Sequence, residues 1–130
     1  MKCIIAGSRT ISDYNTIVKA IKSSGFIDEI TEVVCGDAKG VDSLGATWAK
    51  NNKIPVVHMP ADWKNLNVHP VSIGSNDFGK YNKLAGRNRN EEMGKYADCL
   101  IAVIKDNSTG TAHMIEVMKK LNKPFYVWEV

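Results

Sequence analysis

The sequence has no long uninterrupted apolar run, since none approaches the ~20 residues that span a bilayer. The apolar run near its beginning is also too short for a secretory signal. With 44% hydrophobic and 24% charged residues, the chain has the composition of a globular protein rather than of a disordered tail. Its 130 residues suit one domain, so we expect a single domain over residues 1–130.

Cysteine is scarce, with three residues scattered at Cys3, Cys35 and Cys99. This number and spacing exclude a disulfide framework and a zinc-finger pattern, and they favour a reducing, cytoplasmic location. No closely spaced set of histidine, cysteine and carboxylate residues is present along the chain. We therefore expect no metal site.

Two familiar phosphate-binding motifs are missing. The chain has no G-x-x-x-x-G-K-[ST] sequence, and no G-x-G-x-x-G follows its first predicted strand. These absences exclude a P-loop nucleotidase and argue against an ordinary nicotinamide dehydrogenase. We expect no cofactor.

Positive charge is modest, but it is concentrated in one segment. The net charge of the chain is +3, and residues 61–90 carry five basic residues against two acidic ones. The segment could therefore collect anions such as phosphates. The alternative is a solvated polar loop without a ligand.

Short apolar runs alternate with segments of helical periodicity along the chain. Strands are predicted at residues 2–6, 31–35, 54–59, 99–104 and 125–128. Helices are predicted after Asp13 up to Gly25, from an N-cap at Asp42 to residue 52, over 83–95, and along the stripe Met114, Val117, Met118 and Leu121. A long polar loop is expected over about 60–82.

This alternation predicts an α/β fold: a single Rossmann-like, doubly wound domain with a mainly parallel five-stranded sheet and helices on both faces. In such sheets, ligands bind beyond the carboxyl ends of the strands. The segments that follow the strands here are 7–10, 36–42, 60–63 and 106–111. Glycines, hydroxyls and helix N-termini in these segments favour a phosphate-bearing ligand, although isolated Gly turns can also be ordinary strand-to-helix connections.

Five sequence blocks occur in order over nearly the whole chain. They are Gly7-Ser8-Arg9, Gly36-x-x-x-Gly40-x-Asp42, Pro60-Ala61-Asp62-Trp63, Gly86-Arg87-Asn88-Arg89-Asn90-x-x-Met93 and Ser108-x-Gly110-Thr111-Ala112-x-Met114. Together they resemble the SLOG superfamily, and most of all its small stand-alone proteins.

The resemblance implies a protein that binds a nucleotide ligand and forms a homo-oligomer. Some SLOG members resemble sensors of nucleotide-derived signals, including ADP-ribose-type molecules, in phage–bacterium conflict. The enzymatic branch, the Lonely-Guy phosphoribohydrolases, releases a base from a nucleoside monophosphate. A further relative, the DNA-processing A protein, binds single-stranded DNA.

One departure from the enzymatic branch affects the expected activity. That branch has a Glu three residues after the Gly-Thr pair of its last block, where this chain has Met114. Arg89 is kept, but Glu116 lies two residues further and points to another side of a helix. We therefore expect a binding protein that senses or sequesters its ligand, with a hydrolase in which Asp42, Asp37 or Glu116 replaces the missing Glu as the alternative.

The predicted ligand-binding residues come from all five blocks. They are Gly7, Ser8, Arg9, Gly36, Asp37, Gly40, Asp42, Asp62, Trp63, Arg87, Arg89, Ser108, Gly110 and Thr111. The catalytic candidates are Arg89, Asp42 and Glu116. A third possibility is single-stranded nucleic acid binding through Lys64, Lys80, Lys83, Arg87 and Arg89.

Several of these residues have a second, structural explanation. The arginines could form surface salt bridges instead of binding phosphate. Asp42 could contact a ribose hydroxyl or cap its helix, and Trp63 could stack on a base or anchor the long loop. Cys35 could be a nucleophile or an inert buried thiol, and His113 could reach the site or be an ordinary helix residue.

Overall fold

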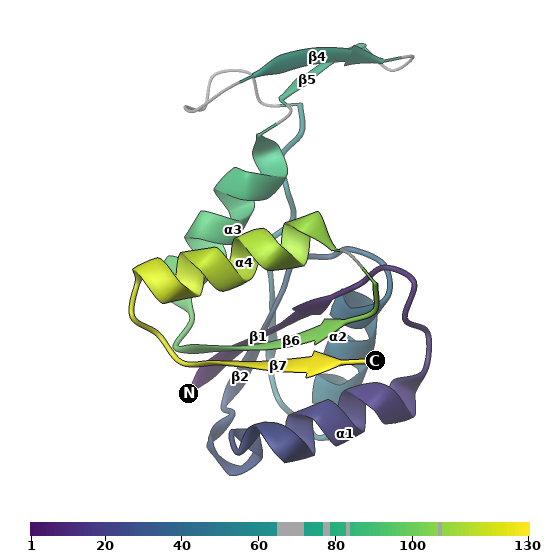
Figure 1. Cartoon of the computed structure of the whole chain (residues 1–130), viewed down its shortest axis with the longest axis vertical. Helices are drawn as coiled ribbons and strands as arrows, with labels where there is room; N and C mark the ends of the chain where they lie inside the picture. Colours follow the sequence, from purple (N-terminus) through teal and green to yellow (C-terminus); the bar gives the residue numbers. More distant parts are fainter. Residues whose placement is uncertain (65–71, 77–78, 83, 107) are drawn as a thin grey trace.

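A five-stranded parallel sheet forms the centre of the protein (Figure 1). The computed structural model describes residues 1–64, 72–76, 79–82, 84–106 and 108–130. The strands are β1 (Lys2–Gly7), β2 (Glu32–Cys35), β3 (Val56–His58), β6 (Cys99–Ile104) and β7 (Phe125–Glu129), in the spatial order β3-β2-β1-β6-β7. Every neighbouring pair in this sheet is parallel, which confirms the predicted Rossmann-like fold class.

Helices cover both faces of the sheet. They are α1 (Tyr14–Ser24), α2 (Val41–Asn51), α3 (Ala85–Tyr96) and α4 (Thr109–Lys120), with a short 3-10 helix at Ile27–Glu29. Successive residues of β1 point to opposite faces, so Ile5 packs in the core under α1 and α2, while Ile4 packs under α3 and α4. This two-sided burial explains why the strands are apolar without alternation.

The helix ends follow local sequence signals in part. Asp13 caps α1 by accepting a hydrogen bond from the backbone N–H of Asn15, and Gly25 ends α1 in the left-handed conformation, as predicted. The prediction that Asp42 caps α2 is wrong. Gly40 occupies that position with φ of 75°, and Asp42 lies inside the first turn, because the chain enters α2 through a conformation that favours glycine.

The third helix is held at its carboxyl end by a lysine from a distant part of the chain. The Lys123 ammonium donates hydrogen bonds to the carbonyls of Gly94, Lys95 and Ala97, at distances of 2.7, 3.0 and 2.7 Å. Cations stabilise the negative end of a helix dipole. This contact joins the end of α3 to the segment between α4 and β7.

The prediction of a long loop over about 60–82 is wrong in its second half. That range contains β4 (Ile73–Asn76) and β5 (Gly79–Asn82), which pair antiparallel and stand away from the main body next to the N-terminal end of α3 (Figure 1). Ile73, the large apolar residue of β4, is 57% exposed, whereas the buried residue beside it is Gly74, so β4 lacks the alternation of buried apolar side chains that predicts a strand. The other strand and helix bounds differ by a few residues; for example, β3 is shorter than the predicted 54–59, and Lys83 lies outside the described residues.

No helix in the described part of the chain is both long enough and apolar enough to cross a membrane.

Two glycines allow the loops above the sheet to pack directly on one another. A Cβ at Gly7 would overlap the carbonyl oxygen of Val103 on β6, where the Ser8 N–H donates to that same oxygen at 3.0 Å. A Cβ at Gly40 would overlap the carbonyl oxygen of Ser8. The segments that follow β1 and β2 and the end of β6 therefore meet at backbone-to-backbone distance.

We predict that Gly7→Ala destabilises the protein by about 3 kcal/mol, because the added methyl meets rigid backbone. Gly110→Ala is the matched control: no atom lies within 4 Å of its added Cβ, and it should stabilise α4 by about 0.5–1 kcal/mol. Denaturant unfolding with unchanged m-values measures both effects. Equal stabilities of Gly7→Ala and the parent protein would contradict the close approach of β1 and β6.

Candidate functional site

A cavity of about 660 Å³ opens beyond the carboxyl ends of β1 and β6. The strand order reverses between these two strands, which is where doubly wound sheets bind ligands. The volume is within the ~300–1,000 Å³ of small-molecule sites. The cavity is lined by Ala6, Gly7, Ser8, Arg9, Thr10, Ala38, Asp42, Trp63, Gly86, Arg87, Arg89, Asn90, Met93, Lys105, Asp106, Ser108, Thr109, Gly110, Thr111, His113 and Met114.

Ser8 fixes the two loops at the bottom of the cavity. Its hydroxyl donates to the carbonyl of Lys105 at 3.0 Å and accepts from the N–H of Lys105 at 2.9 Å, and the residue is 4% exposed. The hydroxyl is thus engaged by backbone on both its donor and acceptor sides. Ser8 positions the loop that carries Arg9 against the loop that leads into α4.

The N-terminus of α4 faces the cavity. Ser108, Thr109, Gly110 and Thr111 all line it, and the hydroxyls of Ser108 and Thr111 are 2.7 Å apart. The first N–H groups of a helix have no partner within the helix, and the helix dipole adds partial positive charge there. This end of α4 can therefore accept an anion such as a phosphate.

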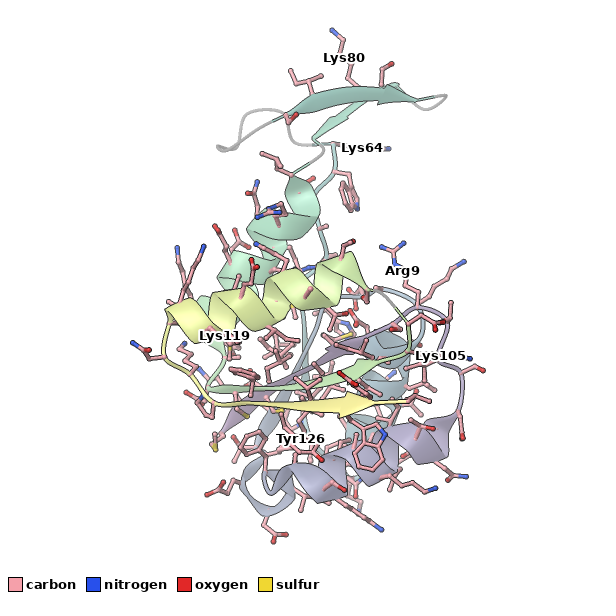
Figure 2. All side chains as sticks on the ribbon, viewed as in Figure 1. Arg9, Lys64, Lys80, Lys105, Lys119 and Tyr126 are labelled. Atoms are coloured by element: carbon pink, nitrogen blue, oxygen red, sulfur yellow. The ribbon has the colours of Figure 1, made fainter. Side chains whose placement is uncertain are left out.

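Four cationic side chains line the cavity: Arg9, Arg87, Arg89 and Lys105. Arg9 follows β1 and Lys105 follows β6, and both side chains lie on the side of the sheet where these strands end (Figure 2). Arg9, Arg87 and Lys105 are exposed enough to meet a ligand from solution. The four cationic side chains outnumber the two acidic ones of the lining, Asp42 and Asp106, so the cavity is positively charged overall.

Arg89 is committed to the protein itself. Its Nη1 donates to the carbonyl of Gly36, and its Nε donates to the side-chain oxygen of Asn90 at 3.1 Å. Its guanidinium therefore joins α3 to the segment that follows β2. One edge of the guanidinium is thereby fixed at the cavity wall.

Asp42 places a buried carboxyl group beside this guanidinium. The residue is 5% exposed, and its Oδ2 accepts a hydrogen bond from the Ala38 N–H at 3.4 Å. Burial raises the pKa of Asp42 above its usual value, while the Ala38 N–H and the Arg89 charge oppose that rise. A Cβ on Gly36 would lie 2.7 Å from Arg89 Nη1 and 2.8 Å from Asp42 Oδ2, so Gly36 makes room for both groups.

Asn90 joins α3 to the start of α4 and was not among the predicted site residues. Its Nδ2 donates to the carbonyl of Gly110 and lies 3.1 Å from His113 Nδ1. Burial lowers the pKa of His113, and the charge of Arg87 lowers it further. Because the Asn90 amide nitrogen only donates, His113 Nδ1 accepts and the proton of the neutral imidazole lies on Nε2. Asn90 thus holds α3, the first turn of α4 and His113 in one network.

Trp63 lies at the rim of the cavity, next to the start of α3. A Cβ on Gly86 would be 3.3 Å from its indole ring, and the side chain is 43% exposed. Trp63 therefore packs on α3 and also presents an aromatic surface to the cavity. Both of its predicted roles, loop anchor and stacking surface, agree with this position.

Five predicted site residues lie outside the cavity lining: Gly36, Asp37, Gly40, Asp62 and Glu116. Gly36 and Gly40 act behind the wall, where they allow close packing. Asp37 is paired with His58 at 2.6 Å, and Glu116 is exposed on α4. Among the carboxylates proposed as substitutes for the missing Glu, Asp42 alone lines the cavity.

Cys35 is a buried thiol and does not line the cavity. Burial raises its pKa to about 12, which disfavours the thiolate that a nucleophile requires. The possible metal ligands histidine, cysteine and carboxylate are not grouped along the sequence, but they can still meet in space. The fold brings Cys35, Asp37 and His58 together, because β2 and β3 are neighbours.

Lys105 was not predicted as a site residue, while Thr10 and Ala38 lie in the predicted strand-end segments 7–10 and 36–42 without having been singled out. Lys105 directly follows β6, so its position at a strand end was a usable signal. Asn90 belongs to one of the five blocks, but its role depends on how α3 and α4 pack. That packing has no local sequence signature.

The imidazole of His113 should titrate below its usual pKa of ~6.5, so it is neutral at pH 7. Arg87→Gln should move this pKa upward but leave it lowered, because burial remains the larger cause. Lys64→Gln is the control with the same change of charge, and Glu91, Glu116 and Lys120 stay in place around the ring. NMR titration of the imidazole measures the shifts, and a His113 pKa above 6.5 in the parent protein would refute this environment.

The fold of this chain is similar to that of a solved structure. The X-ray structure of DNA processing protein A from Streptococcus pneumoniae matches 97% of this chain with a TM-score of 0.65 and 19% sequence identity. The chain corresponds to 49% of the length of that protein. This similarity confirms the Rossmann-like fold.

Sequence comparisons identify the family. No curated protein matches the chain in sequence. The profile of the YspA, cpYpsA-related SLOG family, YAcAr, matches residues 1–66, which include β1, β2, β3 and the loops that follow β1 and β2. The resemblance to the SLOG superfamily is thereby confirmed, and the chain belongs to the YspA, cpYpsA-related SLOG family.

Proposed function

We propose that the cavity binds a small ligand that contains ribose and phosphate, such as a nucleotide or an ADP-ribose-like signal. One observation carries the proposal: the N-terminus of α4 and the side chains of Arg9, Arg87 and Lys105 converge on a cavity that also holds the buried carboxyl of Asp42. Membership of a SLOG family agrees with it.

The phosphate would lie at the N-terminus of α4. Backbone N–H groups and the hydroxyls of Ser108 and Thr111 supply neutral donors there. Arg9 and Arg87 can each offer a planar pair of N–H groups to two phosphate oxygens, and Lys105 adds a point charge. Charge-assisted hydrogen bonds of this kind contribute ~1.5–3 kcal/mol each.

Asp42 and Trp63 would contact the rest of the ligand. A carboxylate accepts hydrogen bonds from the hydroxyls of a ribose, and Asp42 supplies a buried carboxyl group in the cavity. The exposed part of the Trp63 indole can stack on a base. The ligand would thus be held at three chemically different points.

In this proposal the protein senses or sequesters its ligand and acts in the cytoplasm as a homo-oligomer. The absence of a Glu at position 114 supports binding without turnover. Light scattering measures the oligomeric state directly.

One observation favours a second function, hydrolysis of an N-glycosidic bond. Asp42 is a buried carboxyl with a raised pKa next to the Arg89 guanidinium, and such groups occur at catalytic sites. Asp42 would stabilise the positive charge that develops on the sugar as the base leaves.

The first experiment distinguishes these functions. The purified protein is incubated with nucleoside monophosphates, NAD, ADP-ribose, cyclic ADP-ribose isomers and a single-stranded oligonucleotide. Mass spectrometry then identifies the compounds in the filtrate and those released from the protein by heat. An intact small compound on the protein supports binding, free base with ribose phosphate supports hydrolysis, and retention of the oligonucleotide alone would overturn both.

We predict that Lys105→Gln lowers the affinity for the recovered ligand by ~10-fold or more, because it removes one charged phosphate contact. Lys119→Gln is the matched control, since Lys119 lies on the last turn of α4, at the other end from the cavity (Figure 2). Isothermal titration calorimetry measures both variants. If both variants lost the same affinity, the effect would come from the overall charge of the protein, and this would contradict a phosphate contact at Lys105.

Asp42→Asn should lower ligand affinity by ~10-fold, because an amide replaces the carboxylate acceptor for a ribose hydroxyl. If the protein is a hydrolase, the same variant should instead retain binding and lose release of the base. Asp28→Asn is the control for the change of charge, because its 3-10 helix leads into the amino-terminal end of β2, whereas the cavity lies beyond the carboxyl ends of the strands. If Asp42→Asn changed neither the ligand affinity nor the turnover, Asp42 would not contact the ligand.

A further inference from the structure

Three possible metal ligands meet at the carboxyl ends of β2 and β3. Cys35 and His58 are direct partners in the parallel register of these strands, and Asp37 follows Cys35 by two residues. The sulfur, the imidazole nitrogen and a carboxylate oxygen all lie within 4.8 Å of one another. None of the three residues lines the cavity described above.

We propose that Cys35 Sγ, Asp37 Oδ1 and His58 Nδ1 bind a divalent zinc ion, with water in the fourth position. A set of one sulfur, one nitrogen and one oxygen suits zinc, whereas calcium and magnesium prefer oxygen ligands alone. The side chains of His58 and Asp37 are 52% and 36% exposed, so the ion can enter from solvent. This inference does not depend on nucleotide binding.

The distance between the sulfur and oxygen donors matches a tetrahedral zinc site, and the nitrogen donor needs one small movement. Zinc bond lengths of ~2.3 Å to sulfur and ~2.1 Å to nitrogen or oxygen imply ~3.6 Å between sulfur and oxygen, and ~3.4 Å between nitrogen and oxygen. Here Cys35 Sγ lies 3.5 Å from Asp37 Oδ1, while His58 Nδ1 lies 2.6 Å from the same oxygen. The imidazole must move away by roughly 1 Å, which an exposed side chain can do.

The backbone around Cys35 suits a metal-bound sulfur. The Asp37 N–H donates to Cys35 Sγ at 3.4 Å, a hydrogen bond that stabilises negative charge on sulfur. Asp37 has a φ of 59°, in the left-handed region that Asp tolerates better than most residues. In this conformation both its N–H and its carboxylate contact the sulfur of Cys35.

Binding replaces the thiol proton with the metal. The S–H bond breaks, its proton passes to water, and the sulfur electron pair forms the bond to zinc. The thiolate and the Asp37 carboxylate then balance the two positive charges of the ion, and neutral His58 adds none. Zinc binding also replaces the hydrogen bond that the Cys35 thiol donates to the Asp42 carbonyl at 3.4 Å. The Asp42 carboxylate lies beside the Arg89 guanidinium above Gly36.

Zinc would also rigidify the wall of the cavity. Gly36 lies between two of the ligands, Cys35 and Asp37, and its carbonyl accepts the hydrogen bond from Arg89. Fixing Cys35 and Asp37 therefore fixes the anchor of the Arg89 guanidinium. Binding to the folded state alone also stabilises the fold by mass action.

The test uses cobalt as a coloured substitute for zinc. We expect the full-length protein, kept reduced, to bind one cobalt ion with a thiolate-to-metal charge-transfer band and visible bands of tetrahedral geometry. Zinc should displace the cobalt and raise the melting temperature. Cys35→Ser should lose the charge-transfer band, and Asp37→Asn and His58→Ala should weaken binding by at least ~10-fold.

Two variants control for other thiols and histidines. Cys99→Ala removes another buried thiol, and His113→Gln removes a histidine on the other side of the sheet; both should bind cobalt like the parent protein. His58 is largely exposed, so His58→Ala should remain folded, and circular dichroism verifies this. The proposal would be overturned if the parent protein showed no thiolate–cobalt band, or if Cys35→Ser kept that band. It would also be overturned if His58→Ala bound cobalt with the affinity of the parent protein.

Discussion

The contact between the backbones of β1 and β6 at Gly7 determines the arrangement of the site. Because Gly7 has no side chain, the Ser8 N–H reaches the Val103 carbonyl, and the Ser8 hydroxyl then binds both backbone groups of Lys105. These bonds hold the loop after β1 against the loop that leads into α4. The cavity lies above them, at the place where the strand order reverses.

Charge is divided between two parts of this cavity. On one wall, Arg89 is engaged by the Gly36 carbonyl and by Asn90, and it lies beside the buried Asp42 carboxyl. At the other side, the α4 N-terminus faces open space together with exposed cations such as Lys105. The arrangement separates a polar, buried acceptor from an electropositive surface, and a ligand with ribose and phosphate needs both.

Most of the fold could be predicted because its signals are local. Buried strands such as β6 are continuous apolar runs, and α1 begins and ends at residues with strong capping preferences, Asp13 and Gly25. The β4–β5 pair was not predictable because Ile73 is exposed and the buried position next to it is a glycine, so β4 shows no alternation of buried apolar side chains. The start of α2 was not predictable from capping preferences, because Gly40 is the N-cap with a φ of 75° and makes no side-chain cap hydrogen bond, whereas Asp42 is a common capping residue.

The sequence by itself determined the order of the strands and helices of the parallel domain, the superfamily, and the convergence of loops from several strand ends. These follow from hydrophobic periodicity and short motifs, whose causes lie within a few residues. Only the tertiary structure decided that Asn90 joins Gly110 and His113, that Glu116 is exposed outside the cavity, and that Cys35 meets His58. These contacts join residues about 20 or more positions apart, or depend on helix rotation, so strand register and helix packing determine them.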